Sequence, residues 1–481
     1  MKVNPSLVCK QQNNLKNSNS QVQKNFNETN DSHSEINLNL QPNAHLNKLS
    51  FTGSLNKGIE SAEVFVGKFL KTESPIESAK LLLGRYPELS WLTGSVNATP
   101  EGVAKTSKSI SEAIFGKQHT EFDRTLTGIE TIKWVLKGDY EQFTKCQKPE
   151  VKLTRENFDH LKRYTHEVLP KPEDVDAMIG YTVINDLGKI KSVVSDIQQK
   201  TGIHAVDHDD ILLYALKHTP EEVPTFKRLS PEHKDTVVRS LEPQFNIGQF
   251  LQAENLPANL TGLKNLDPKA MDYYLTHAVY DIAGAAGHVN PDGSVVMTNP
   301  LYEGFKQGIN SIKRLSNGES EATVYNSFMQ AKAEALQMPF DTPKDKALAK
   351  LAVLSRAGST GEAKTIRNVF ESLSDEHQKT LTTHLNRTGI EDKGILLYYA
   401  PAFLQNLKGA LKEQPEQALQ KGFSTLAELY QRADKMADKP KGVFTVLISD
   451  IAKTAKEAPE KLLPENISLK PVGDNAEAII A

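Results

Sequence analysis

Carboxylate and imidazole side chains fall on the apolar faces of several helices that the sequence predicts in the centre of the chain. Asp186 is the clearest case, because it shares one helical stripe with Val175, Ile179 and Thr182. A buried carboxylate must be neutralised, hydrogen-bonded or paired with a cation. Lys189, three residues further on, can supply that cation. An internal ion pair and a bound metal ion therefore both explain an inward-facing Asp186.

A second polar pair lies on a helix predicted to begin at Asp267. His277 and Asp281 are one turn apart, and His288 follows His277 by eleven residues, which returns to nearly the same helical angle. A histidine and a carboxylate in successive turns can bind one metal ion, because their side chains lie one above the other. A buried hydrogen bond between the two side chains is the structural alternative.

His208 and Asp209 are two further candidate ligands, at the start of another predicted helix. Acidic residues are expected in the first turn of a helix because they complement its dipole, so Asp209 alone carries little information. His208 shares a face with three apolar residues, Ile211, Leu212 and Ala215. A metal ligand and a hydrogen-bonded core histidine are the two interpretations of His208.

This set of oxygen and nitrogen ligands suits a divalent metal ion, either Mg²⁺, Mn²⁺ or iron, and zinc less specifically. Such an ion would polarise a phosphoryl oxygen or generate hydroxide from water. Lys189, His277, His288 and Glu254 are the candidate catalytic side chains. Glu254 belongs to a polar segment, 245–259, that either lines a pocket or forms the exit of a helix.

Helices are the elements that must position these residues, and the predicted fold class is all-α. Pro172 suits the first turn of the helix before Asp186, and Asp267-Pro268 is a good start for the helix of His277. The glycines Gly284 and Gly287 can end that helix. Another helix is predicted over 230–255. The only short strand candidate is 293–297.

The pattern Leu-Ser-x-Glu-His occurs twice, from Leu229 to His233 and from Leu373 to His377. A two-fold internal repeat is one explanation. The favoured explanation is a common way to start a helix, with the serine as N-cap and the acidic residue in the first turn.

Composition divides the chain into four parts. Residues 1–50 are rich in Asn, Gln and Ser and are predicted to be disordered, because such a segment cannot bury enough apolar area. A helical N-terminal region is predicted over 51–150 and a single all-helical domain over 151–453. The charged segment 454–481 is predicted to be a flexible tail.

Charge and hydropathy exclude several classes of function. The net charge is -3 and the basic residues are spread along the chain, which argues against nucleic acid as a ligand. Two cysteines, Cys9 and Cys146, form no disulfide framework and favour a reducing compartment. No signal peptide and no apolar run of membrane-spanning length is present. A cytoplasmic protein that does not bind membranes is expected.

The segment Asn185-Asp186-Leu187-Gly188-Lys189 resembles the His-Asp-(Ile/Leu)-Gly-Lys motif of the HD superfamily of helical metal-dependent phosphohydrolases. The resemblance implies an HD-domain-like helical core with additional helices on both sides. It also implies metal ligands at Asp186, at His208 as a downstream histidine and at Asp281 as the closing aspartate. The leading histidine would be His160 or His166, and His166 is preferred. Asn185 stands where the motif has its histidine, so this ligand position departs from the family pattern.

A longer set of segments resembles an uncharacterised bacterial and fungal family. The matching segments, over about 153–407, are Asn185 to Lys189, His208-Asp209, Gly248 to Ala258, Asp281 to His288, Arg356 to Gly358 and Tyr398 to Phe403. The resemblance implies one large helical domain and no known activity. From Arg356 to Gly361, the chain either holds an anion with backbone amides or forms a turn between helices, and the turn is favoured.

Three functions remain open at this point. The first is a metal-dependent hydrolase of phosphate esters or nucleotides, acting on a small phosphorylated substrate. The second is a non-catalytic, degenerate HD-like scaffold or interaction protein, which the departure at Asn185 favours. The third is an iron-dependent oxygenase, because HD-like folds can hold iron.

Overall fold

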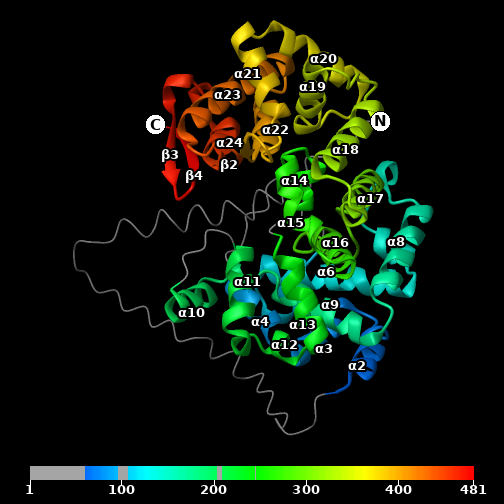
Figure 1. The fold of residues 1–481 in the computed structure, drawn as a ribbon. Helices are drawn as coiled ribbons and strands as arrows, with labels where there is room; N and C mark the ends of the chain where they lie inside the picture. The colour runs from blue at the N-terminus through cyan, green and yellow to red at the C-terminus, as the bar shows by residue number, and fades with distance from the viewer. Residues whose placement is uncertain (1–59, 96–106, 203–207, 244, 481) are drawn as a thin grey trace, which may run out of the picture.

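The computed structural model describes residues 60–95, 107–202, 208–243 and 245–480, and this part of the chain is mostly helical with one small β-sheet (Figure 1). The segment 1–50, predicted to be disordered, lies outside the described residues. Buried apolar side chains form two large clusters, one reaching from Phe65 to Met329 and the other from Ala333 to Ala478. The boundary between them falls inside one helix, α18 (Glu321–Ala335).

The first cluster is built from the helices α2 (Ala62–Phe69), α3 (Pro75–Arg85), α4 (Glu88–Trp91), α5 (Ile110–Phe115), α6 (Thr120–Lys137), α7 (Tyr140–Thr144), α8 (Arg155–Val168), α9 (Pro172–Ile184), α10 (Lys191–Thr201), α11 (His208–His218), α12 (Pro224–Arg228), α13 (Pro231–Leu241), α14 (Ile247–Leu251), α15 (Thr261–Lys264), α16 (Pro268–Gly284) and α17 (Asn299–Lys313).

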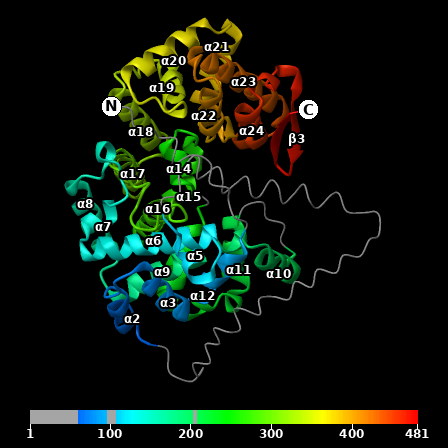
Figure 2. The same cartoon turned by 180° about the vertical axis from the view of Figure 1, so that it is seen from behind.

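The second cluster is built from α19 (Pro343–Leu354), α20 (Thr360–Ser372), α21 (Asp375–Asn386), α22 (Ala400–Ala410), α23 (Pro415–Met436) and α24 (Ser449–Glu457), together with the strands β1 (Lys393–Tyr398), β2 (Gly442–Leu447), β3 (Ile467–Val472) and β4 (Asn475–Ile480). The helices of the first cluster and those of the second form two groups. In both views α14, which belongs to the first group, lies at the border with the second (Figures 1 and 2). The apolar core divides within α18, inside the range 151–453 for which the sequence predicts one domain.

Helix α6 runs through the centre of the first cluster, and every residue from Thr120 to Val135 is buried. It crosses α16 at very short range. A Cβ atom added to Gly284 of α16 would lie 2.3 Å from the backbone nitrogen of Gly128 in α6, closer than real Cβ atoms approach. The glycine at the end of α16 therefore allows the two backbones to come this close.

Several predicted helix boundaries are confirmed. Pro172 begins α9, and Asp267 caps α16 by accepting the backbone N–H of Ala270 at 3.0 Å. The helix predicted over 230–255 is instead two helices, α13 and α14, separated by a break that includes Pro243. Proline lacks a backbone N–H and cannot continue a helix through its interior.

The sheet was not predicted, so the all-α expectation is correct only for the greater part of the described chain. Its strand order is β1-β2-β4-β3, with β1 and β4 parallel to β2 and with β3 antiparallel to β4. Residues 293–297, the predicted strand, form no strand and lie in bends and irregular backbone. The segment 454–481, predicted to be a flexible tail, instead supplies β3 and β4.

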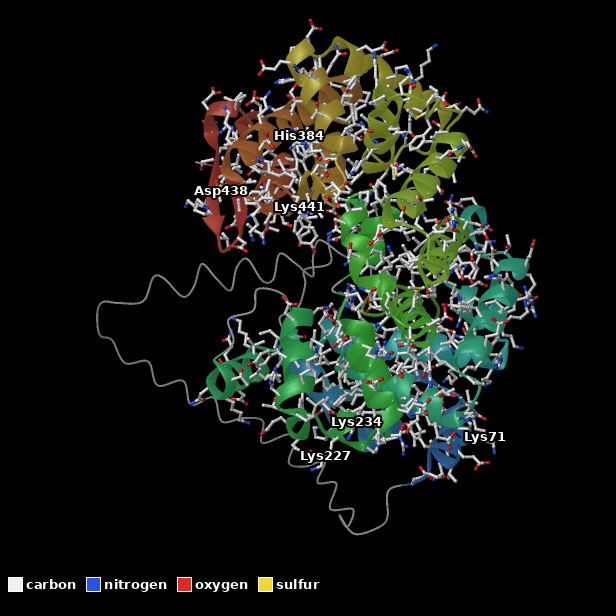
Figure 3. All side chains as sticks on the ribbon, in the orientation of Figure 1. Lys71, Lys227, Lys234, His384, Asp438 and Lys441 are labelled. Atoms are coloured by element: carbon white, nitrogen blue, oxygen red, sulfur yellow. The ribbon has the colours of Figure 1, made fainter. Side chains whose placement is uncertain are left out.

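Exposed lysines such as Lys71 and Lys227 are spread over the outside of the first group of helices (Figure 3). Within the described residues, no helix combines the length and the apolar character that crossing a membrane requires.

Candidate functional site

Asp186 lies in a buried cluster of charged side chains. We call this the charge cluster, and its paired members are Asp186, Lys189, Glu121 and Arg124. Helix α9 ends at Ile184, and the chain turns through Asp186 into a short 3₁₀ helix, Leu187–Lys189. Asp186 is only 5% exposed, and its Oδ1 lies 2.6 Å from Nζ of Lys189. The same Nζ lies 3.2 Å from Oε2 of Glu121, in α6. The predicted burial of Asp186 is therefore confirmed, and its cation partner is Lys189.

Arg124 is the second cation of this cluster. Its Nη1 lies 3.2 Å from Oε1 of Glu121, one turn earlier in α6. Burial by itself would lower the pKa of Arg124, but the carboxylates of Glu121, Asp281 and Asp186 outweigh this effect and raise it. Lys189 behaves in the same way, with Asp186 and Glu121 raising its pKa against burial. Both cations are therefore held in their charged form by surrounding carboxylates.

His277 lies at the edge of the charge cluster, on α16. It is 4% exposed, and its ring packs against Tyr181 with 4.1 Å between ring centroids. Burial lowers the pKa of His277, while Asp281 and Asp186 act in the opposite direction. Of the predicted site residues, the structure pairs Asp186 with Lys189, and the charges of Asp281 and Asp186 act on the ring of His277.

Other predicted site residues lie elsewhere. The side chain of His166 is exposed on α8, whereas the charge cluster is buried. Asn185 caps the end of α9, where its backbone N–H binds the carbonyl oxygen of Tyr181. His288 is buried, but it lies beyond the end of α16. Because that helix stops at Gly284, His288 does not share a helical face with His277.

Glu254 belongs to a different part of the molecule. Its carboxylate accepts the backbone N–H of Tyr399, at the end of β1, so it joins the first group of helices to the second. His208 and Asp209 begin α11, but their side chains lie outside the described residues.

A divalent metal ion does not fit the part of the charge cluster that the structure describes. Lys189 already pairs with Asp186, and Arg124 adds a second positive charge that both Asp281 and Asp186 influence. Among the described side chains, no group of three or more His, Cys, Asp and Glu residues is placed to hold an ion. The arrangement therefore resembles an internal ion-pair network more than a metal centre.

Glu121 and Arg124 were missed by sequence reasoning. Helix α6 is buried on all sides and carries the charged residues Glu121, Asp123, Arg124, Glu130 and Lys133, so its apolar residues show no clean amphipathic stripe. The position of such a helix becomes clear only when its partners are known. Lys133, for example, is paired with Glu130 at 2.7 Å.

The two Leu-Ser-x-Glu-His patterns perform the same local task. Ser230 and Ser374 each cap a helix by accepting the backbone N–H of the histidine three residues later. Each histidine then reaches a carboxylate on a neighbouring helix, with 3.1 Å between His233 and Asp174 and 3.4 Å between His377 and Glu428. The arrangement of Ser230, His233 and Asp174 resembles a catalytic triad, but its recurrence at a second helix start favours capping.

A surface cleft of about 850 Å³ lies beside His233, and none of the predicted site residues lines it. Its charged groups are largely paired with one another. Arg85, for example, donates from Nε and Nη2 to the two carboxylate oxygens of Asp176, at 2.7 and 2.5 Å.

Comparison with known proteins shows which family the chain belongs to. Neither a curated protein nor a solved structure matches the chain. A family model described as "Family of unknown function (DUF6829)" matches residues 86–462, which include the charge cluster, α14 and most of the second group of helices. The chain belongs to this family, DUF6829.

Proposed function

We propose that the protein is a non-catalytic helical scaffold or interaction protein with an HD-like core, in which buried ion pairs take the place of a metal centre. The observation that carries this proposal is the position of Lys189, 2.6 Å from Asp186 and 3.2 Å from Glu121. A divalent ion at Asp186 would meet Lys189 and Arg124, and like charges repel strongly where water is excluded.

The charge cluster then has a structural task. Glu121 and Arg124 come from α6, Lys189 follows α9, and Asp281 lies on α16. The pair of Lys189 and Glu121 joins the end of α9 to α6, and the charge of Asp281 acts on Arg124 from α16. These interactions favour one relative orientation of α6 and the end of α9, because any other leaves a buried charge without a partner.

A metal-dependent hydrolase of phosphate esters or nucleotides is the second candidate. The observation in its favour is that the charges of Asp281 and Asp186 both act on the buried His277 ring. These are the residue types that the HD-like resemblance assigns to a metal site. An iron-dependent oxygenase would use the same ligands.

Thermal unfolding of the full chain with Asp186→Asn separates these functions. For a scaffold, the substitution lowers the melting temperature by the same amount in EDTA and in Mn²⁺. Asp159→Asn is the matched control, because Asp159 is an exposed carboxylate paired with Arg155 on the surface of α8. The melting temperature of this control variant is expected to stay close to that of the unsubstituted protein.

A hydrolase gives a different pattern. The unsubstituted protein would melt at a higher temperature in Mn²⁺ than in EDTA and would release phosphate from p-nitrophenyl phosphate or a nucleotide. Asp186→Asn would abolish both effects. Such a result contradicts the scaffold proposal.

A further inference from the structure

A second buried polar centre lies where the segment after α14 meets α19. It consists of Asn255, Lys350, Ser355 and Arg356, together with Tyr325, whose ring centroid lies 5.3 Å from Nζ of Lys350, and we call it the junction centre. The segment 252–255, which follows α14, contacts Lys350 of α19 and Arg356, which comes directly after α19. Residues from both groups of helices therefore meet here.

Among the described residues, the two cations of the junction centre have no carboxylate partner. Lys350 is 5% exposed, and its Nζ donates to the carbonyl oxygen of Asn255, at 3.2 Å. Arg356 donates from Nη2 to the amide oxygen of Gln252 at 2.6 Å. Burial alone lowers the pKa of both side chains, to about 7 for Lys350, with no compensating anion. This is the opposite of the charge cluster, where carboxylates raise the pKa of both cations.

Several buried polar atoms around these cations lack a hydrogen-bond partner within the described structure. They are Oδ1 of Asn255, the hydroxyl of Tyr325, Oγ of Ser355 and Nη1 of Arg356. Asn255, Tyr325 and Ser355 are each at most 5% exposed. Buried polar groups are almost always paired in proteins, so this concentration of unpaired donors and acceptors indicates a missing partner.

Backbone strain is concentrated at the same place. Four residues other than glycine have a positive φ in the described chain, and three of them, Ala253, Arg356 and Tyr399, lie at or beside the junction centre. Tyr399 has φ 85°, and its N–H is bound by Glu254. Left-handed backbone at such residues is unfavourable, and it gathers where a chain must present particular groups to a ligand.

We propose that the junction centre binds the phosphate group of a small organic phosphate. Arg356 and Lys350 supply positive charge and N–H donors, and the hydroxyls of Tyr325 and Ser355 supply further donors. A guanidinium beside an ammonium group is a common way to hold phosphate oxygens. The unpaired Oδ1 of Asn255 can only accept, so it fits a hydroxyl or N–H group on the organic part of the ligand.

The ligand approaches from the side of Arg356 and Lys408, because both of these side chains are only half-buried. Lys408, on α22, donates from Nζ to the carbonyl oxygen of Ser355 at 3.1 Å, and it adds positive charge to the entrance. The backbone amides at the start of α20 do not take part. Gly358 and Glu362 already donate their N–H groups to the side chains of Glu362 and Ser359.

Inorganic phosphate is the probe for this site, with the full chain and thermal unfolding as the measurement. Sodium acetate and sodium chloride of matched ionic strength are the salt controls. The variants are Lys350→Met and Arg356→Met, with Lys344→Met as the matched control on the exposed face of α19. Binding to the native state alone raises the melting temperature by a few degrees when the ligand is well above its dissociation constant.

The expected result has two parts. Phosphate, but not acetate, raises the melting temperature of the unsubstituted protein and of Lys344→Met, and this rise is lost in Lys350→Met and Arg356→Met. Without phosphate, these last two variants melt at a higher temperature than the unsubstituted protein, because each removes an uncompensated buried charge.

Three results would overturn the proposal. They are no phosphate-dependent rise in the unsubstituted protein, a rise that survives both substitutions, and an equal rise in acetate. A merely structural role for Lys350 would show as a lower melting temperature of Lys350→Met in all salts. None of these outcomes depends on Asp186, so this site and the proposed function succeed or fail separately.

Discussion

Nζ of Lys189 lies 2.6 Å from Oδ1 of Asp186, three residues earlier in the chain, and both side chains are less than one tenth exposed. The pair is connected through Glu121 to Arg124, so two acids and two bases form a continuous buried chain. Asp186, which the sequence suggested as a metal ligand, is here part of an internal ion network.

Removing either Asp186 or Lys189 should lower the free energy of unfolding strongly, and removing both should lower it less. Lys189→Met leaves two buried carboxylates with reduced compensation, and we expect it to lower the free energy of unfolding by about 3–5 kcal/mol. The double variant Asp186→Leu/Lys189→Met should recover part of that loss, because apolar residues of similar size can replace a buried pair. Urea denaturation of the four proteins in a double-mutant cycle measures the coupling. Strictly additive effects would show that the two side chains do not stabilise one another.

The crossing of α6 and α16 predicts a second large effect. Gly284→Ala would place a Cβ atom 2.3 Å from the nitrogen of Gly128 and 2.4 Å from the carbonyl oxygen of Arg124. The helices must separate to admit it, and we expect a loss of about 1–3 kcal/mol or more. Gly304→Ala in α17 is the control, because its added Cβ meets no atom within 4 Å. Equal melting temperatures for the two variants would contradict the close crossing.

The pH dependence of stability tests the environment of Lys350. Its pKa is about 7 in the folded protein and its ordinary value is 10.5. Between these values the unfolded chain binds more protons, so stability should rise with pH and be lost as the pH falls toward 7. From pH 7 to pH 9 this contribution is at most ~3 kcal/mol. Denaturant titrations at both pH values should show a smaller rise for Lys350→Met than for the unsubstituted protein. If the free energy of unfolding rose equally with pH in both proteins, Lys350 would be charged from pH 7 to pH 9 in both the folded and the unfolded state.

The two capping serines should behave alike. Ser230→Ala and Ser374→Ala each remove one acceptor for a backbone N–H at a helix start, and we expect each to lower the free energy of unfolding by ~1 kcal/mol. Chemical denaturation measures both. If Ser230→Ala instead left stability unchanged and abolished an esterase activity, the arrangement of Ser230, His233 and Asp174 would be catalytic.

Local features of the sequence predicted the helices well where caps and periodicity agree. Pro172 and Asp267 mark helix starts by their backbone chemistry alone, and both starts are present. The inward position of Asp186 followed from its apolar neighbours. These properties depend on residues within a few turns of one another, which is why the sequence reveals them.

Features that depend on distant partners were not predictable in the same way. Glu121 and Arg124 meet Asp186 only because α6 is enclosed on all sides. Strand β1 contains the short apolar run Ile395 to Leu397, but its parallel partner β2 comes more than forty residues later. The junction centre likewise combines the end of α19 with the loop after α14. Arg356 was considered in the sequence for a turn and for anion binding, whereas nothing in the sequence around Lys350 distinguishes it from the other lysines of α19.

The metal content of the purified full chain tests the central claim most directly. Elemental analysis after equilibration with Mn²⁺, Fe²⁺ or Zn²⁺ and removal of free metal would be made on the unsubstituted protein and on Asp186→Asn. An ion network at Asp186 predicts substoichiometric metal in both proteins, with no difference between them. One equivalent of tightly bound metal in the unsubstituted protein, lost in Asp186→Asn, would contradict the account and restore the metal-dependent hydrolase.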